Sequence, residues 1–332
     1  AETAEADLGS LPPPLAERPE AASHWRDIPL GLAWTLRRAG HSPVGMEAVF
    51  GGDIPIGAGV SSSAAVEMAF LFAWEALAGF RLDGATRARL GQRTENEYLG
   101  VASGIADQFA CLHGRRDHLI LLDCRSLEFE SLPLPPGCAV LVADSGVRRN
   151  LAGSGYNDRQ QECRQGLESL RQRLPHLRTL RDLSAEELEE HGGLLEAPIR
   201  RRVQHVVEEC ARVPAGAEAL RRGDLAGLGS LMRDSYASSR DLYEVTLPEL
   251  DSLAEAAWSS PGCYGARLAG GGFGGCIQAL VEAGSIEIVE ARVRKDFSRQ
   301  YGRKPLIFAS TIADGTRYVD ESGASTGPPE IE

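Results

Sequence analysis

The sequence has 332 residues, of which 43% are hydrophobic and 25% are charged, so it is long enough for two domains with sizeable cores. Its formal net charge of −12 argues against a protein that binds nucleic acid or an anionic membrane, because no extended face could neutralise the phosphates. An anionic ligand would have to be met locally, by backbone dipoles, a metal ion or a few arginines.

Residue types that are scarce or scattered exclude several chemistries. Lysine occurs only at Lys295 and Lys304, so there is no Gly-Lys pair for a Walker-type phosphate loop and no early lysine for a protein-kinase site. The seven cysteines are odd in number and scattered, with no C-x-x-C pair, which predicts reduced thiols in a cytoplasmic protein. The seven histidines show no H-x-x-x-H or mixed Cys/His pattern, which argues against structural zinc. Glu67 and Glu75 interrupt the longest apolar run before it reaches membrane-spanning length.

The first part of the chain is expected to be mainly helical. Residues 1–24 are rich in Pro, Glu and Ala and read as an irregular leader. The spacing of apolar residues predicts a helix over Trp25–Gly40, and alternation predicts a strand over Val44–Gly57. A long apolar helix then begins at about Ser61, and a further helix follows over Thr86–Tyr98.

Strand character appears twice more along the chain, on either side of a helical region. The runs "HLILLDCRSLEFESLPL" and "CAVLVADSGV" look like strands that pair with each other. From Tyr156 to about Trp258 the pattern is helical and charged, and Ser184 with Glu187 forms a capping box. Strands return at "GARLAGGGFGGCIQALV" and "PLIFASTIADGTRYV". The fold class is therefore α+β (mixed α/β), with two domains, 1–155 and 156–332.

The stretch Gly57–Ser63, "GAGVSSS", places two glycines and three serines at the mouth of the apolar helix. Glycine allows a positive φ and a close backbone approach, and the first helical turn has unpaired N–H groups at the positive end of the dipole. This combination predicts a cradle for an anion such as phosphate. The simpler interpretation is a strand–turn–helix with serine caps, but one cap satisfies a helix and three are redundant.

A second glycine-rich stretch, "GGGFGG" at Gly270–Gly275, lies between two strand-like runs. Ordering each glycine costs roughly 0.5–1 kcal/mol more than ordering an alanine, so a purely structural turn rarely has so many. A flexible hairpin tip is one interpretation. A second backbone surface for a bound nucleotide explains the composition better.

Two carboxylates, Glu95 and Asp107, lie in the segment "TENEYLGVASGIADQF" with small residues between them. Near a phosphate cradle, one carboxylate would hold Mg²⁺ and the other would orient or deprotonate an acceptor hydroxyl. A single acidic residue is more often a solvated or capping residue. The functional interpretation therefore depends on the whole combination.

These segments together resemble the superfamily of galactokinase, homoserine kinase, mevalonate kinase and phosphomevalonate kinase. "PIGAGVSSSAA" is similar to its second motif and "LAGGGFGG" to its third. Within the superfamily the chain is most similar to galactokinases, from about Trp25 to Val319, and "SSRDLYEVTLPELDSL" is specific to them. The resemblance implies a two-domain small-metabolite kinase fold, with an N-terminal part like domain 2 of ribosomal protein S5 and a ferredoxin-like C-terminal part with added helices.

The resemblance also implies a function and its residues. It implies a kinase that uses ATP and Mg²⁺ to phosphorylate the anomeric hydroxyl of galactose, with Asp107 as the catalytic base. Gly104 and Tyr156, with Asp107, match sugar-binding positions, and Ser63 and Glu95 match Mg²⁺ ligands. The positions that match ATP-binding residues are Trp25 near the adenine, Gly57, Ala58, Gly59, Val60, Ser61, Ser62, Ser63 and Ala64 in the phosphate loop, and Gly271, Gly272 and Gly274 in the loop that closes over it.

One motif of the family has no counterpart here. Galactokinases begin with a segment of the form R-x-N-L-I-G-E-H-x-D-Y, which supplies an arginine beside the base and several sugar contacts. Ala1 aligns downstream of it, so we expect a front end of the protein to be missing from the sequence. Without that arginine to keep Asp107 ionised, the sequence as it stands should be a poor catalyst.

Other hypotheses are compatible with the same residues. Galactokinase-like proteins can act as sensors that bind ATP and sugar without turnover, although a sensor does not need Asp107, Glu95 and Ser63. A kinase of this type could also act on an N-acetylated hexosamine, arabinose or a uronic acid. A serine hydrolase is disfavoured, because Ser61–Ser63 has no G-x-S-x-G elbow. We expect a monomer or weak homo-oligomer that binds small molecules, and neither nucleic acid nor a membrane.

Overall fold

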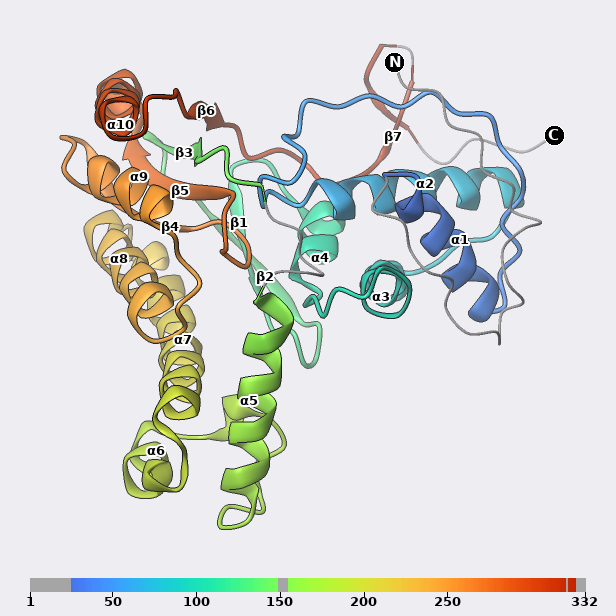
Figure 1. Cartoon of the computed structure of the whole chain (residues 1–332). Helices are drawn as coiled ribbons and strands as arrows, with labels where there is room; N and C mark the ends of the chain where they lie inside the picture. Colours follow the sequence, from blue (N-terminus) through green and yellow to red (C-terminus); the bar gives the residue numbers. More distant parts are fainter. Residues whose placement is uncertain (1–24, 149–154, 321, 327–332) are drawn as a thin grey trace. The chain divides into compact units, whose positions relative to one another are not determined.

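The computed structural model describes residues 25–148, 155–320 and 322–326, and these fall into two compact units (Figure 1). The predicted leader, 1–24, lies outside the described residues. Unit 1 takes residues up to 55, 61–131 and those from 312 on, whereas unit 2 takes 56–60 and 132–311. The units differ from the predicted parts 1–155 and 156–332, which stay a prediction about where the functional elements divide. The predicted mixture of helices and strands is confirmed.

Unit 1 is built around a helical core. The predicted helix over Trp25–Gly40 is confirmed as α1, whose acidic first turn and basic last turn suit the helix dipole. α2 is apolar almost all round, and its residues are buried or half-buried except Ala69 and Leu77. Gly79, with φ 71°, caps its C-terminal end. Asp83 caps α3 by accepting the Thr86 N–H at 2.9 Å. The elements are α1 (Asp27–Arg38), α2 (Ser62–Ala78), α3 (Gly84–Arg93), a π-helix (Thr94–Leu99), α4 (Ala106–His113), β1 (His118–Leu122), β2 (Phe129–Pro133), β7 (Tyr318–Val319) and β8 (Ser325–Thr326).

The predicted strand over Val44–Gly57 is wrong, because this stretch forms neither strand nor helix. A strand exists through hydrogen bonds to a neighbouring strand, and within the described ranges no segment pairs with this one. Its apolar side chains are accordingly not covered: Val49 is fully exposed and Ile56 is 80% exposed. The alternation in the sequence was therefore not a sign of a half-buried sheet.

Residues 312–320 return to unit 1 after the chain has completed unit 2. The Thr316 N–H donates to the Cys111 carbonyl at 2.7 Å, and the Tyr318 hydroxyl donates to the Phe72 carbonyl at 3.0 Å. Gly315 packs so closely that a Cβ there would lie 2.4 Å from the Leu112 carbonyl oxygen. This returning segment is thus an integral part of unit 1.

Unit 2 contains a four-stranded antiparallel sheet in the order β4-β5-β3-β6. The strands predicted on both sides of the glycine stretch are confirmed, and so is the one after Pro305. The predicted pairing of the first two strand runs is wrong: β1 pairs with β2, whereas β3 pairs with β5 and β6. The strands are β3 (Cys138–Asp144), β4 (Cys263–Leu268), β5 (Cys276–Glu282) and β6 (Leu306–Ser310).

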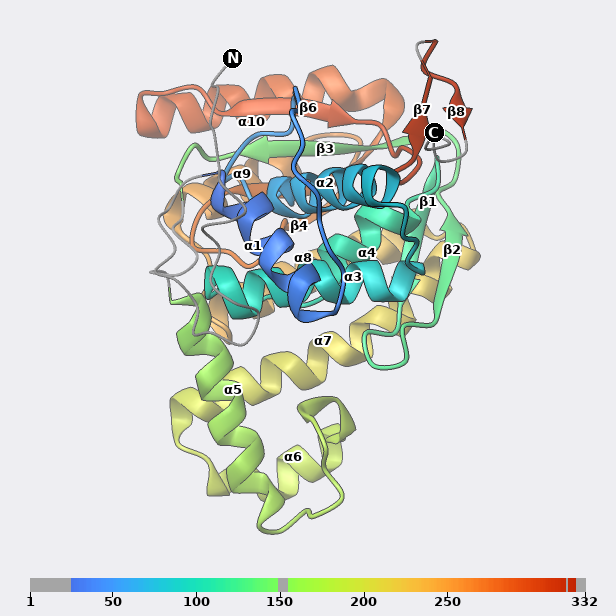
Figure 2. The same ribbon diagram turned by 90° about the vertical axis from the view of Figure 1, so that its right-hand side faces the viewer.

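The helices of unit 2 cover this sheet and extend beyond it. α9 and α10 pack on the sheet through a core that includes Leu250, Ala257, Val293 and Phe297, all fully buried. Figure 2 shows α5, α6 and α7 on the side of unit 2 away from α10. The helices are α5 (Tyr156–Arg171), α6 (Ala185–His191), α7 (Ala197–Arg221), α8 (Leu225–Asp241), α9 (Pro248–Trp258) and α10 (Ile286–Tyr301), with 3₁₀ turns at Leu180–Asp182, Gly192–Leu194 and Ala283–Ser285.

Three further predictions are tested by the fold. The capping box of Ser184 and Glu187 is confirmed at the start of α6, with both reciprocal hydrogen bonds present. All seven cysteines lie in the described ranges and each is a free thiol. Of the helices described, none is long and apolar enough to cross a membrane.

Candidate functional site

The serine-rich helix entrance of unit 1 does not behave as a simple cap. α2 begins at Ser62, and the preceding Ser61 has a left-handed backbone with φ 62° and makes no side-chain cap hydrogen bond. The interpretation of the serines as redundant N-caps is therefore not supported by the geometry. A left-handed turn directly before a helix is typical of a concave arrangement of backbone N–H groups that receives anions.

The two predicted metal ligands lie in contact. The Ser63 hydroxyl donates to Glu95 Oε1 at 2.7 Å, and Glu95 is only 7% exposed. Glu95 reaches this position from the π-helix Thr94–Leu99, which continues α3 with a wider turn. Such π-helical turns occur frequently at functional sites. The sequence predicted a single helix here and missed this change.

The hydroxyl and the carboxylate form an oxygen donor set of the kind that Mg²⁺ prefers. Mg²⁺ is usually held by one or two carboxylates together with substrate phosphates and waters, rather than by a cage of protein ligands. Consistently, in residues 25–148, 155–320 and 322–326 no three His, Cys, Asp or Glu side chains gather into a metal cage. The oxygen donors of Ser63 and Glu95 thus fit a phosphate-bound Mg²⁺.

Asp107 stands in the first turn of α4, where its side chain is exposed to solvent. The positive end of the helix dipole favours a carboxylate at this position. Gly104, the other predicted sugar contact of this segment, is also exposed, and a Cβ placed on it would touch nothing within 4 Å. The two residues are accessible to a ligand.

A third carboxyl group, on Glu67, was missed as a site residue. It is fully buried on α2 and accepts a hydrogen bond from Gln108 Nε2 at 3.0 Å. Burial raises the pKa of Glu67 well above its ordinary value of 4.5, and the nearby carboxylates of Glu95 and Asp107 raise it further against the effect of the Gln108 hydrogen bond. The signal was present in the sequence as an acidic residue inside an otherwise apolar helix.

The raised pKa of Glu67 makes the free energy of unfolding depend on pH. The native state holds the proton more tightly than the unfolded state, so stability is fully present below the ordinary pKa of 4.5 and falls as pH rises toward the raised pKa. The slope approaches about 1.4 kcal/mol per pH unit. We expect Glu67→Gln to remove this slope, as measured by urea unfolding at a series of pH values.

The matched control is Glu75→Gln, which changes the second fully buried glutamate of α2. Glu75 is ion-paired with Arg87 at 2.9 Å, so this variant should destabilise the protein by leaving a guanidinium without its partner. If Glu67→Gln keeps the slope of the unsubstituted protein above pH 4.5, Glu67 is ionised in the native state and the prediction is wrong.

In unit 2 the first glycine loop, residues 57–60, contacts the second glycine loop, Gly270–Gly275. Residues 56–60 pack against this unit, and Ala58 is fully buried in a cluster with Val142, Ala269 and Cys276. Gly275 has φ 80°, and a Cβ placed on it would lie 2.4 Å from the Ala58 carbonyl oxygen. Two stretches that are more than 200 residues apart in the sequence are thereby in backbone contact.

The individual glycines of these loops have the conformations that the prediction required. Gly57 and Gly59 have φ of 70° and 80°, and Gly272 and Gly274 have φ of 78° and 126°. A Cβ on Gly272 would lie 2.2 Å from the Val245 carbonyl oxygen. Of the remaining predicted residues, Val60 and Gly271 lie in these loops, whereas Ala64 is fully buried in the first turn of α2.

A cation that was not predicted as a site residue lies beside the first loop. Arg148 follows β3, and its Cδ atom would be 3.4 Å from a Cβ on Gly57. Its guanidinium pairs with the buried Asp144 at 2.7 Å. The half-exposed arginine is therefore held in place next to the loop. The composition left a few local arginines as one of three ways to meet an anionic ligand, but nothing in the sequence selected this one.

The two remaining predicted site residues are Trp25 and Tyr156. The Trp25 ring packs on Phe50, with centroids 4.9 Å apart, so packing alone is enough to explain a tryptophan there. Tyr156 is the first residue of α5. The preceding Gly155 lies against the second glycine loop, since a Cβ on it would be 2.9 Å from Phe273 Cζ. Tyr156 thus begins next to that loop within unit 2.

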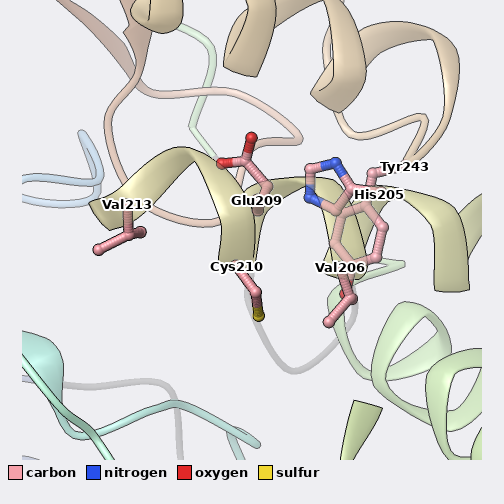
Figure 3. Close-up of a pocket in the computed structure, with 6 residues that line it drawn as sticks. All are labelled: His205, Val206, Glu209, Cys210, Val213 and Tyr243. Atoms are coloured by element: carbon pink, nitrogen blue, oxygen red, sulfur yellow. The ribbon is translucent and has the colours of Figure 1, made fainter. Parts of the chain in front are cut away.

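A hollow of about 260 Å³ lies elsewhere on unit 2 (Figure 3). The His205 ring stacks on Tyr243 with centroids 4.3 Å apart, and burial lowers the pKa of His205 to about 4, so the ring is neutral at physiological pH. The hollow includes none of the predicted site residues. It is lined by His205, Val206, Glu209, Cys210, Val213 and Tyr243.

Comparison with known proteins gives concordant matches along the chain. Residues 27–115 match the family "GHMP kinases N terminal domain", and residues 217–299 match "GHMP kinases C terminal". A galactokinase of Roseiflexus sp. is 43% identical over 295 residues, which cover 89% of this chain and 75% of that protein. A galactokinase of Bos taurus is 39% identical over 313 residues, covering 93% of this chain and 77% of that protein.

Solved structures give the same result. Lactococcus lactis galactokinase complexed with galactose matches with a TM-score of 0.83 and 33% identity, covering 90% of this chain and 77% of that one. Homoserine kinase from Cytophaga hutchinsonii matches with a TM-score of 0.57 at 16% identity, covering 89% of this chain and 79% of that one. The second match shows a shared fold alone.

Proposed function

Because the chain belongs to the galactokinase family of the GHMP kinases, we propose that it transfers the γ-phosphoryl group of ATP to the anomeric hydroxyl of galactose. The product is galactose 1-phosphate. The observation that supports this chemistry most directly is the hydrogen bond between Ser63 and Glu95, because it joins the serine-rich helix entrance to a buried carboxylate. An enzyme of this kind is a sugar kinase.

The nucleotide phosphates are held mainly by backbone groups. In this proposal the N–H groups of Gly57–Ala64 surround the phosphates, and Gly271, Gly272 and Gly274 form the second backbone surface. The contact of Gly275 with Ala58 supports it, because both loops then have one fixed spacing within unit 2. Arg148 adds a positive charge beside Gly57, and Trp25 lies near the adenine.

Ser63 and Glu95 would hold Mg²⁺ together with the phosphate oxygens. When bound, the ion neutralises the charge that spreads over the phosphoryl group during transfer. Glu95 suits this task because it is buried and its position is fixed by the π-helix. Ser63 would supply its hydroxyl oxygen as a second ligand.

Asp107 acts on the sugar, with Gly104 and Tyr156 as further sugar contacts. The anomeric hydroxyl oxygen forms a bond to the γ-phosphorus, the bond between that phosphorus and the ADP oxygen breaks, and the hydroxyl proton passes to the Asp107 carboxylate. General base catalysis of this kind contributes about 10²–10⁴-fold to a rate. The solvent exposure of Asp107 supports a role toward a ligand rather than in the core.

We expect Ser63→Ala and Glu95→Ala to raise the Mg²⁺ concentration that gives half-maximal activity, because each removes one oxygen ligand. Titration of initial rates with Mg²⁺ at saturating ATP measures this. Glu97→Ala is the control: it changes another carboxylate of the π-helix, one that pairs with Arg93 at 2.9 Å, and should leave the midpoint unchanged. An unchanged midpoint in the Ser63 and Glu95 variants would remove both residues from the metal site.

The proposed function is tested by measuring ADP release with galactose, on protein expressed from the complete gene. Release that depends on galactose supports the proposal. Binding of ATP and galactose without ADP release would show a sensor instead. A panel of N-acetylated hexosamines, arabinose and uronic acids then ranks the acceptor, and a better substrate than galactose in that panel would correct the sugar while keeping the kinase.

The cellular setting is part of the proposal. We place the protein in the cytoplasm, where reducing conditions keep thiols free, and the seven free cysteines support this. Its partners are then the sugar and Mg-ATP. The expectation of a monomer or weak homo-oligomer stays a prediction.

A further inference from the structure

The segment Leu242–Val245 connects α8 to α9, and all four of its carbonyl oxygens accept hydrogen bonds from distant parts of unit 2. Arg202 Nη1 donates to the first at 2.6 Å, and Arg159 donates to the second and third at 2.7 and 3.4 Å. The fourth accepts the Phe273 N–H at 2.6 Å. A short loop is thus held by two arginines on one side and contacts the second glycine loop on the other.

The two arginines are themselves fixed by carboxylates. Arg202 on α7 is only 3% exposed, and it donates to Glu162 at 2.8 Å and to Glu244 at 2.7 Å. Arg159 on α5 donates to the same Glu162 at 2.9 Å. A buried guanidinium requires such partners, because an unpaired buried charge is strongly unfavourable. Each of the three nitrogen atoms of the Arg202 guanidinium therefore donates one of these hydrogen bonds.

Glu244 is the residue at which these contacts converge. Its backbone is left-handed with φ 54°, a conformation that non-glycine residues adopt only when their surroundings enforce it. Its side chain accepts from Arg202 and, at 2.8 Å, from Arg201, and the hydrogen bond from Arg202 lowers the pKa of Glu244 to about 2. The same residue thus has a strained backbone and an ionised side chain that binds the arginines holding the segment.

The glycine loop takes its shape from the other side of this segment. Phe273 has φ 57° and is bound through its N–H to Val245, and Gly272 lies so close that a Cβ would be 2.2 Å from the same carbonyl oxygen. The Arg159 guanidinium also lies 5.9 Å from the centre of the Phe273 ring. A shift of the Val245 carbonyl would therefore move the loop backbone.

We propose that Arg159, Arg202 and Glu244 are positioning residues for ATP, because they hold Leu242–Val245 so that the Val245 carbonyl fixes the glycine loop in the conformation that receives the phosphates. The inference rests on the proposed function in assigning that loop to the nucleotide. None of the three side chains needs to touch ATP. Their effect is transmitted through one backbone hydrogen bond, from Phe273 to Val245.

The test compares Glu244→Gln with Glu208→Gln in the otherwise unchanged protein. Both glutamates are partly exposed and pair with an arginine of α7. The Glu208 pair with Arg212, at 2.6 Å, makes no hydrogen bond to Leu242–Val245 within the described part of the chain. We expect Glu244→Gln to raise KM for ATP about twofold to thirtyfold, the range of indirect coupling within a domain. KM for galactose should stay unchanged, and Glu208→Gln should leave both values as they are.

A third variant, Glu244→Gly, separates the side chain from the backbone. Glycine adopts the left-handed conformation without strain, so the variant keeps the turn and loses the carboxylate. The proposal expects it to raise KM for ATP as Glu244→Gln does. Recovery of the original KM would mean that only the turn matters, and the network would then have no role in positioning.

Hydrogen exchange gives a readout that needs no activity. Without nucleotide, the backbone amides of 270–276 should exchange faster in Glu244→Gln than in Glu208→Gln or the unsubstituted protein, because the Phe273 hydrogen bond opens more often. Equal exchange in the three proteins overturns the proposal. A parallel change in both KM values together with lower thermal stability also overturns it, since it indicates a purely structural ion-pair network. Failure of the unsubstituted protein to bind ATP contradicts the proposed function instead, and the exchange comparison still decides whether the network holds the loop.

Discussion

Asp107→Asn is expected to lower kcat for sugar phosphorylation by about 10²–10⁴-fold, the usual contribution of a general base. Asparagine has nearly the same shape as aspartate but cannot accept the proton of the anomeric hydroxyl. The side chain is exposed at the start of α4, so its replacement leaves the core of unit 1 unchanged. Affinity for ATP, measured by calorimetric titration, should stay close to that of the unsubstituted enzyme.

The control for Asp107→Asn is Glu47→Gln, which also neutralises an exposed carboxylate of unit 1 but lies in the irregular stretch before the phosphate loop. It should turn over normally. If both variants keep the kcat of the unsubstituted enzyme, Asp107 is not the base. A loss of ATP affinity equal to the loss of kcat would assign the residue to nucleotide binding instead.

Gly275→Ala is expected to have the second-largest effect, by separating the two glycine loops of unit 2. The added Cβ would meet the Ala58 carbonyl oxygen at 2.4 Å, and the residue has φ 80°. Overpacking of this kind costs about 1–3 kcal/mol, and a left-handed non-glycine residue costs roughly 1–2 kcal/mol. We expect a lower melting temperature, measured by calorimetry, and a raised KM for ATP.

Gly302→Ala separates these two costs. Gly302 ends α10 with φ 66°, and a Cβ placed there has nothing within 4 Å, so the variant has the backbone cost without the clash. It should be mildly destabilised and bind ATP normally. If Gly275→Ala resembles Gly302→Ala in both measurements, the contact with Ala58 is dispensable and the close spacing of the loops is not needed for nucleotide binding.

Much of the helical fold could be predicted because its causes are local. The apolar spacing over Trp25–Gly40 and the capping box at Ser184 each depend on residues within a few positions of one another. The strand over Val44–Gly57 failed for the opposite reason. Alternation of side chains is a local property, but a strand requires a partner, and the sequence does not show which segments pair. The wrong pairing expected for β3 has the same origin.

The candidate site also contains residues that the sequence selected and residues that only the structure revealed. The resemblance selected Ser63 and Glu95, and the structure places them in hydrogen-bonding contact, although their roles stay proposals. It did not select Glu67 or Arg148. Their significance comes from what surrounds them: a buried position beside two other carboxylates for Glu67, and a place beside Gly57 for Arg148. Contacts of this kind join distant parts of the chain, and one sequence contains no direct record of them.

The return of residues 312–320 to unit 1 has a consequence for synthesis. A ribosome makes all of 132–311 before it reaches the segment that donates hydrogen bonds to the Cys111 and Phe72 carbonyls. At about 5–20 residues per second, the 180 residues from 132 to 311 take about 10–40 s to translate. During that interval the Cys111 and Phe72 carbonyls of unit 1 lack these hydrogen-bond donors. Unit 2, in contrast, has all its residues as soon as residue 311 has emerged from the ribosome. Unit 2 should therefore complete its folding before unit 1, although most of unit 1 is synthesised first.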